Sequence, residues 1–281
     1  MIRRRIERWH DRGFTRTDLL AALTVTLLLA LLQLSAANHD ATQRDTAVCL
    51  SNLRRLNQAW LLYASDSRDF FPPNLVDGGR SNWVYGSEGT VPDETTILSL
   101  QTLVDGRYSK LGPYSRDPTI YRCPADQTVI RAGSRTYFHN RSFSANHAVG
   151  TKRDGVSPVD GAWLDGNYTH IANKVWYTFS KLSDVVRPTP AQLWILIDED
   201  GASINDGSFA VIMPQTQMID WPATRHDMSA TISYADGSAE IHRWRDQRTI
   251  VRNGNVNRIV QAGNEDIIWL QNSTTRRVTS N

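Results

Sequence analysis

Few side chains in this sequence could carry out chemistry, and the two cysteines come first. Cys49 and Cys123 lie far apart in the chain, and neither belongs to a CxxC pair. No histidines cluster beside them, which argues against a zinc site. In an exported domain two cysteines pair more often than they stay free, and a disulfide closing so long a loop stabilises by roughly 4 kcal/mol. Export therefore predicts a Cys49–Cys123 disulfide, and the alternative is two unrelated buried thiols.

His226 and Asp236 are the pair of residues that suggests acid–base catalysis. No serine or cysteine nucleophile stands in a recognisable elbow beside them. We therefore predict that His226 anchors a hairpin by hydrogen bonding, and we expect the protein not to be an enzyme.

A run of oxygen-bearing side chains, IDEDGASINDG, is a candidate cation site. Carboxylate and amide oxygens are the ligands that Ca²⁺ prefers, but Ala202 takes the third ligand position of an EF-hand and the final Glu is missing. A solvated acidic loop with turn-forming residues is the alternative. We expect no other cofactor. The candidate Ca²⁺ ligands are Asp198, Asp200, Asn205 and Asp206.

A long helix must position the first cysteine. Residues 14–71 contain neither Gly nor Pro, the two strongest helix breakers. The spacing of the apolar residues after residue 48 puts them on one helical face. We predict one helix over 14–64, about 75 Å long and amphipathic in its second half. The predicted face consists of Cys49, Leu53, Leu56, Trp60 and Tyr63.

A basic leader and an apolar run precede that face. Residues 1–13 carry five arginines against Glu7 and Asp11, or +3, which leaves −1 of the net +2 for the rest of the chain. A near-neutral remainder gives no electrostatic case for nucleic acid. The run 19–37 has no formal charge and matches the roughly 20 residues of a spanning helix, with the arginines on the cytoplasmic side. A signal peptide cut near Ala37 is the alternative.

The residues around the start of the apolar run carry a family resemblance. Gly13-Phe14 followed by an acid at Asp18 resembles the cleavage and methylation signal of type IV pilins and type II secretion pseudopilins. The resemblance implies cleavage between Gly13 and Phe14, N-methylation of Phe14, and a role for Asp18 in assembly. There the carboxylate neutralises the new amine of a neighbouring subunit. An aspartate that only caps the helix N-terminus is the alternative.

The resemblance extends along the chain through a fixed order of short motifs: C-x-x-NL-x-x-L, Y-x-x-D, YRCPAD, DE…SINDG and RH…ADG. This order is similar to that of a pseudopilin-like family abundant in planctomycete and verrucomicrobial bacteria. Its signature, a His followed after nine residues by Asp-Gly, falls on His226, Asp236 and Gly237, which we expect to be structural. The resemblance implies a long N-terminal helix packed on a small antiparallel sheet.

Short apolar runs after Pro72 predict the strands of that sheet. The segments 192–198 and 208–213 are typical of strands. Asp236-Gly237 between two alternating runs predicts a hairpin over 229–244. We predict that its register sets Tyr234 opposite Ala239 and Ile232 opposite Ile241.

Together these features predict an α+β, type IV pilin-like fold, in which a transmembrane and then amphipathic helix packs on an antiparallel β-sheet head. The predicted function is a pseudopilin-like structural subunit of a type II secretion or type IV pilus-like filament. We expect a single-pass inner-membrane protein whose head lies in the periplasm or on a filament. The predicted segments are a leader (1–13), a transmembrane half-helix (14–37), a periplasmic half-helix (38–71), a head (72–270) and a flexible tail (271–281).

The resemblance also implies partners, namely other copies or other pseudopilins, a prepilin peptidase, an inner-membrane assembly platform and the membrane itself. Nucleic acid is not among them. The alternative function is a membrane-anchored binding protein that does not polymerise. It would recognise a glycan or an envelope partner through exposed aromatic side chains, because the head contains seven of the nine tryptophans.

Overall fold

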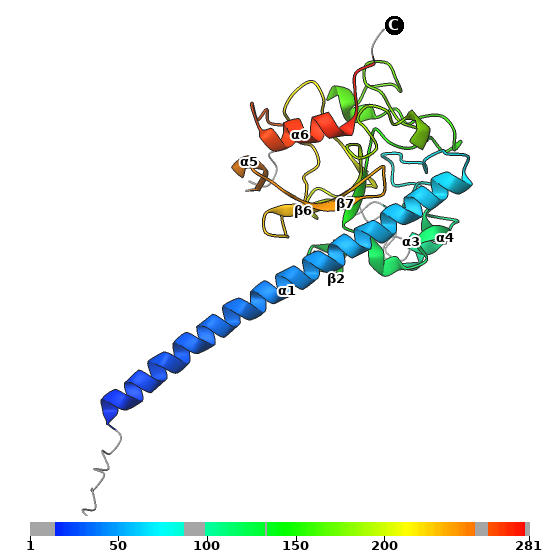
Figure 1. The fold of residues 1–281 in the computed structure, drawn as a ribbon. Coiled ribbons are helices and arrows are strands. Elements are labelled where there is room, and N and C mark those ends of the chain that lie inside the picture. The colour runs from blue at the N-terminus through cyan, green and yellow to red at the C-terminus, as the bar shows by residue number, and fades with distance from the viewer. Residues whose placement is uncertain (1–14, 87–98, 133, 251–257, 279–281) are drawn as a thin grey trace, which may run out of the picture. The chain divides into compact units, whose positions relative to one another are not determined.

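The computed structural model describes residues 15–86, 99–132, 134–250 and 258–278. The chain divides into two compact units, residues 1–44 and 45–281. Helix α1 (Arg16–Asp66) belongs to both units and is 51 residues long, as the absence of Gly and Pro predicted (Figure 1). It ends where Arg68 and Asp69 take left-handed backbone conformations, with φ of 54° and 73°, just before Pro72.

One part of the prediction for α1 is wrong. Within the described residues, no helix combines the length and the apolar character that crossing a membrane requires. The part of the run 19–37 whose side chains the structure describes ends at residue 30, so it is shorter than the roughly 20 apolar residues that a spanning helix needs. This finding overturns the predicted transmembrane half over 14–37, and with it the predicted single-pass location in an inner membrane.

The head contains a five-stranded sheet in the order β5-β3-β4-β6-β7. The prediction of an antiparallel sheet is wrong. Strand β5 pairs in parallel with β3, so the sheet is mixed. The segment predicted as a strand over 208–213 shortens to the two residues of β5. The strands are β3 (Phe143–Asn146), β4 (Trp194–Asp198), β5 (Ser208–Phe209), β6 (Ser229–Tyr234) and β7 (Ala239–Arg243).

The predicted hairpin forms, but its register differs by one residue from the prediction. Ser233 lies opposite Ala239, and Thr231 lies opposite Ile241. The loop is longer than two residues, since the amide of Tyr234 bonds the carbonyl of Ser238, and Gly237 takes a φ of +91° inside the loop. A glycine with positive φ is typical of hairpin loops of three residues. The shift leaves Ile241 45% exposed.

Two apolar clusters cover the two faces of the sheet. The predicted face of α1 is confirmed: Cys49, Leu53, Leu56 and Trp60 are fully buried and pack with Ile195 and Leu196 of β4, and Tyr63 is partly buried against the same cluster. Helix α6 (Glu265–Thr274) covers the opposite face, where Ile267 and Leu270 pack with Trp194 and Ile197. Figure 1 shows strands β6 and β7 between the cyan end of α1 and the red α6.

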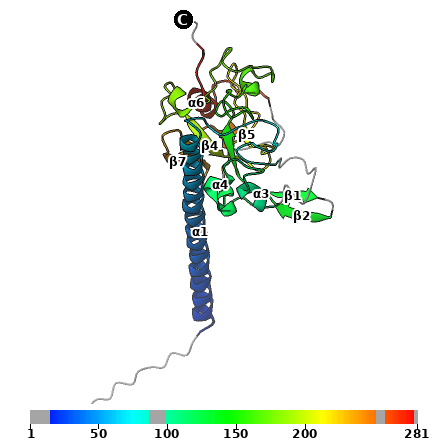
Figure 2. The same cartoon turned by 90° about the vertical axis from the view of Figure 1, so that its right-hand side faces the viewer.

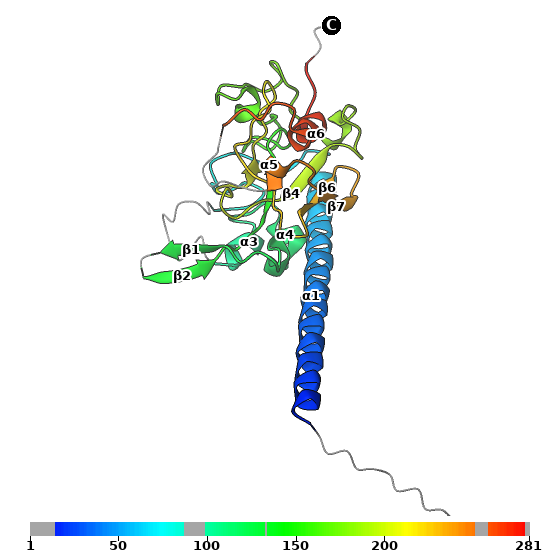
Figure 3. The ribbon, with the colours of Figure 1, turned by 90° about the vertical axis from the view of Figure 1, so that its left-hand side faces the viewer.

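Shorter elements surround this core. A separate hairpin of β1 and β2 lies beside α3, away from the main sheet (Figures 2 and 3). The remaining elements are α3 (Gln101–Val104), α4 (Gly112–Ser115), α5 (Gln247–Ile250), β1 (Val129–Ala132), β2 (Arg135–Phe138) and the 3₁₀ turns η1 (Pro118–Tyr121), η2 (Ala162–Asp165) and η3 (Leu182–Asp184).

The C-terminal residues are also more ordered than the sequence predicted. Helix α6 continues to Thr274, and Arg277 forms an antiparallel bridge with Trp176. The amide of Val278 donates to the carbonyl of Val175. Residues 271–278, predicted as a flexible tail, therefore belong to the folded head.

Asp220 is a buried carboxyl group whose protonation should affect stability. It is 5% exposed, and the amide of Ala210 donates to its Oδ2 at 2.6 Å. Burial raises its pKa well above the ordinary value of 3.8. A raised folded pKa gives stability that is fully present below the unfolded pKa and is lost as the pH rises through the folded pKa.

We predict that Asp220→Asn, which keeps an oxygen acceptor for Ala210 but carries no charge, removes this loss. Measured by urea unfolding from about pH 4 to about pH 8, the wild type should lose more unfolding free energy than the variant as the pH rises. If the unfolding free energies of the two proteins changed equally with pH, the proposed cost of charging Asp220 would be contradicted.

Candidate functional site

The predicted processing residues Gly13 and Phe14 lie outside the described residues, and the description begins beside Asp18. Thr15 and Asp18 cap α1 reciprocally: the amide and the hydroxyl of Thr15 donate to Asp18 Oδ2 at 2.9 and 2.6 Å, and the amide of Asp18 donates to Thr15 Oγ1 at 3.2 Å. The hydroxyl and then the amide of Thr15 lower the pKa of Asp18. Asp18 thus makes the contacts of a residue that caps the N-terminus of α1, which was the alternative to a role in assembly. Its role in assembly stays a prediction.

The part of α1 that follows Asp18 presents an apolar surface. Its threonines do not interrupt that surface, because Thr24 and Thr26 donate their hydroxyls to carbonyls of the preceding turn, at 2.8 Å to Ala21 and 2.7 Å to Ala22. The large aliphatic side chains are 50–62% exposed. They are Leu19, Leu20, Leu23, Val25, Leu27, Leu28 and Leu29.

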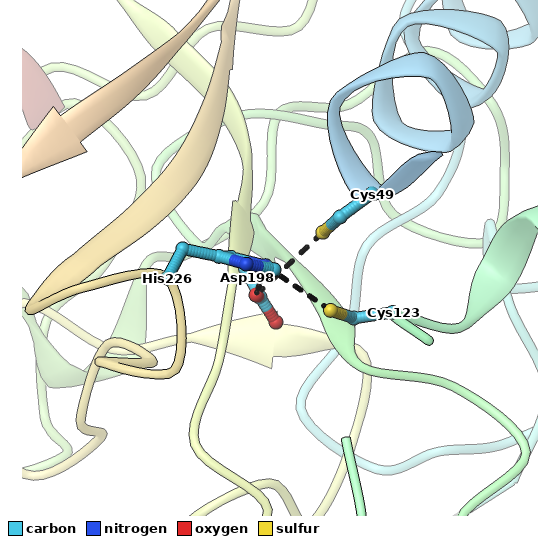
Figure 4. Close-up of side chains that lie close together, drawn as sticks. All are labelled: Cys49, Cys123, Asp198 and His226. Carbon is cyan, nitrogen blue, oxygen red and sulfur yellow. Dashed lines mark hydrogen bonds and ion pairs between the residues drawn. The ribbon is translucent and has the colours of Figure 1, made fainter. Parts of the chain in front are cut away.

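A different group of residues meets inside the head. Cys49 from α1, Cys123 from the loop after η1, Asp198 from the end of β4 and His226 from the loop before β6 converge on one point (Figure 4). Their ligand-type atoms all lie within 4.8 Å of one another. All four residues are buried. We call them the Cys₂AspHis cluster.

A β-bulge in β4 directs Asp198 into this cluster. Trp194 and Ile197 face α6, whereas Ile195 and Leu196 both face α1. Side chains of a regular strand alternate between faces, so two neighbours on the same face require an irregularity. The register shift between Trp194 and Leu196 provides it. Asp198, two residues after Leu196, consequently points toward α1.

The distances within the cluster are short. Cys123 Sγ lies 3.2 Å from His226 Nε2, and Asp198 Oδ2 lies 3.5 Å from the same nitrogen. Cys49 Sγ lies 3.8 Å from Asp198 Oδ2. The imidazole nitrogen Nε2 therefore faces both a sulfur and a carboxylate oxygen.

A second set of side chains surrounds the cluster. Thr46 Oγ1 lies 3.0 Å from the other ring nitrogen of His226, Nδ1. Arg225 donates to Asp198 Oδ1 at 2.7 Å and also approaches Asp126 at 3.6 Å. Thr231 Oγ1 lies 3.3 Å from Cys49 Sγ. Thr46 and Arg225 contact Nδ1 of His226 and Oδ1 of Asp198, so Nε2 and Oδ2 of these two residues face the cluster.

The cluster has unusual proton affinities. Burial raises the pKa of Cys49 well above its usual value. The hydrogen bond from Cys49, supported by His226, lowers the pKa of Cys123 to about 7 in spite of burial. Burial opposes protonation of His226, but the bonds to Asp198 and Cys123 outweigh it and raise its pKa to about 9. Of the two thiols, Cys123 therefore loses its proton more readily than Cys49.

The predicted disulfide is not present in the structure, which contains Cys49 and Cys123 as free, buried thiols. The two cysteines do meet, within 4.8 Å, but Asp198 and His226 meet them too. Sequence reasoning dismissed a zinc site because no histidine is near either cysteine in the chain. The available signal was the motif order, since C-x-x-NL, YRCPAD, DE and RH each contribute one residue to the cluster.

The family signature is divided between two places. His226 is in the cluster, whereas Asp236 accepts hydrogen bonds from the amide and hydroxyl of Ser238 in the hairpin loop, at 2.9 and 2.6 Å. Gly237 occupies the positive-φ position of that loop. His226 and Asp236 therefore do not form a catalytic pair.

The predicted Ca²⁺ ligands do not converge. Asp198 belongs to the cluster, and Asp200 caps its own turn by accepting from the amide of Ala202 at 2.8 Å. Asp206 and Asn205 accept from the amides of Ser208 and Asp206, respectively. Of the described residues, only the Cys₂AspHis cluster brings three or more His, Cys, Asp or Glu ligand atoms together.

No family model matches the sequence, and neither a curated protein nor a solved structure matches it. The pseudopilin-like resemblance is therefore still a prediction.

Arg225 should be essential for the stability of this region. It is the cation beside two buried carboxylates, and removing one partner of a buried ion pair costs about 3–5 kcal/mol. We predict that Arg225→Met lowers the free energy of unfolding by this amount. Arg55→Met is the matched control, because Arg55 pairs with Asp117 at 2.7 Å on the surface and such pairs contribute within about 1 kcal/mol. If both variants lost the same unfolding free energy in urea, the buried ion pair of Arg225 would not be essential for stability.

Proposed function

We propose that this protein is a pilin-like structural subunit that assembles with other copies of itself through the first part of α1. The observation that supports this proposal is the continuous apolar surface between Leu19 and Leu29. It lies on a helix whose second half packs into the core of the head. An apolar surface of this extent is normally covered by another apolar surface.

The partner that best fits this apolar surface is the same helix in a second copy of the chain. Leucine-rich helices pack on one another through interdigitated side chains, and every copy offers the same surface. The charges are also complementary, since cleavage after Gly13 would create an amine at Phe14, which the carboxylate of Asp18 in a neighbouring copy would neutralise. Asp18 is exposed, so its carboxylate is accessible to such a partner.

The alternative, a binding protein with exposed aromatic platforms, has less support. Trp83, Trp194, Trp221 and Trp244 are buried. The other head tryptophans are half-buried and covered by cationic or aromatic partners. Arg258 lies 4.7 Å from the ring of Trp163, Arg277 lies 5.3 Å from Trp176, and His242 stacks on Trp269 at 3.8 Å.

Introducing a charge into the apolar surface should weaken assembly. Burying a leucine contributes about 2 kcal/mol, so Leu23→Asp should raise the dissociation constant of the oligomer by roughly 30-fold or more. Leu62→Asp is the matched control, because Leu62 is 55% exposed and Leu23 is 58% exposed on the same helix. Sedimentation velocity of the full chain measures both. Unchanged oligomers for Leu23→Asp would refute the proposed surface.

The two roles of Asp18 can be separated with Thr15. The chain is co-expressed with a prepilin peptidase, and mass spectrometry checks that it begins at Phe14. Asp18→Ala removes the cap and the charge, whereas Thr15→Ala removes capping bonds and keeps the charge. We expect crosslinked oligomers to decrease for Asp18→Ala and to persist for Thr15→Ala. Equal behaviour of the two variants would leave Asp18 as a cap alone, and an N-terminus at Met1 would contradict the processing.

A further inference from the structure

We propose that the Cys₂AspHis cluster binds one Zn²⁺ ion, with Cys49, Cys123, Asp198 and His226 as its four ligands. The ion would fasten the second half of α1 to the sheet of the head. This inference goes beyond the proposed assembly and does not depend on it.

The atomic distances fit a tetrahedral ion. Zinc lies about 2.3 Å from sulfur and about 2.0–2.1 Å from nitrogen or oxygen, so the ligand atoms of a tetrahedral site lie about 3.3–3.8 Å apart. The separations found are 3.2 Å for Cys123 to His226, 3.5 Å for His226 to Asp198 and 3.8 Å for Cys49 to Asp198. The other three separations lie within 4.8 Å, so the four ligand atoms surround one point that a single ion could occupy.

The orientation of His226 separates a metal site from a catalytic triad. In a triad the carboxylate holds one ring nitrogen and the nucleophile meets the other. Here Cys123 and Asp198 both approach Nε2, and Thr46 occupies Nδ1. A proton relay through the ring is therefore not available. A shared central cation explains why a sulfur, a carboxylate oxygen and a ring nitrogen converge.

The surrounding contacts resemble those that support metal ligands. A metal-bound histidine usually donates its second ring N–H to an acceptor, which Thr46 Oγ1 provides at 3.0 Å. Arg225 holds the Oδ1 of Asp198, so that Oδ2 faces the cluster. Zn²⁺ with two thiolates and one carboxylate has a net charge of −1, and the guanidinium of Arg225 lies beside this negative charge.

The chemistry of the ligands and their burial indicate a structural zinc ion. Thiolate and imidazole ligands together favour zinc over Ca²⁺ or Mg²⁺, which prefer oxygen. Four protein ligands leave no position open for water or substrate, and all four residues are buried. Because the ligands come from four separate segments, zinc binding would depend on the fold and would stabilise it.

An entry route for the ion is visible at Cys123. This residue contributes to the wall of a pocket of about 540 Å³, which also contains Asn52, Arg122 and His139. A cation in this pocket would meet Cys123 first, because Cys123 is the one cluster residue among the pocket's lining residues.

The first test is the metal content of the full chain, purified under reducing conditions from zinc-supplemented cells. Elemental analysis should find one zinc per chain, and Co²⁺ exchanged into the protein should show the intense absorption of a tetrahedral cobalt–thiolate site. These readouts use the wild type, so they do not depend on whether a variant folds. A folded chain without zinc, a chain with iron in its place, or a mass lower by two hydrogens from a Cys49–Cys123 disulfide would each overturn the proposal.

Variants test the ligand set. Asp198→Asn and His226→Gln should lose zinc to a competing chelator, whereas Asp220→Asn and His147→Gln, which change buried residues outside the cluster, should retain one zinc per chain. Retention of zinc by both ligand variants would overturn the assignment.

Thr46 tests the supporting contact. Thr46→Val removes the acceptor for His226 Nδ1 and should weaken zinc affinity by about 10–100-fold, and Thr46→Ser should restore it. An unchanged affinity for Thr46→Val would contradict the proposed geometry. Loss of zinc and loss of assembly are separate readouts, because the Leu23→Asp variant should retain the metal.

Discussion

The head depends on how it accommodates the buried carboxylate of Asp198. A charge in an apolar interior is costly unless it is paired and hydrogen-bonded. Arg225 donates a hydrogen bond to one oxygen of this carboxylate. The other oxygen faces the two cysteines and the histidine of the cluster. The bulge in β4, the loop before β6 and the packing face of α1 all serve to bring these groups together. A zinc ion at their centre would complete the same set of interactions.

Much of the local structure could be predicted because it depends on neighbours in sequence. The absence of Gly and Pro predicted the length of α1, and the spacing from Cys49 to Trp60 predicted its buried face. The hairpin at Asp236-Gly237 followed from its turn residues. Its register did not, because a loop of two residues and a loop of three share the same Asp-Gly signal, and only the fold selects between them.

The cluster and the mixed sheet could not be predicted because they depend on long-range contacts. Cys49 and His226 lie far apart in the chain, and the bulge that directs Asp198 has no marker such as a glycine. The same carboxylate was read as part of an acidic Ca²⁺ loop, since Asp200 and Asp206 are its neighbours in sequence. The predicted membrane span failed for a different reason: its leucines are exposed, but within the described residues no helix is both long and apolar enough to cross a membrane.

The zinc K-edge X-ray absorption spectrum of the full chain tests the central claim most directly. The account predicts a four-coordinate shell with two sulfur atoms at about 2.3 Å and two nitrogen or oxygen atoms at about 2.0–2.1 Å from the metal. This composition distinguishes the Cys₂AspHis cluster from surface sites, which contain no cysteine because the chain has only Cys49 and Cys123. A zinc shell without sulfur, or with a single sulfur, would contradict the account.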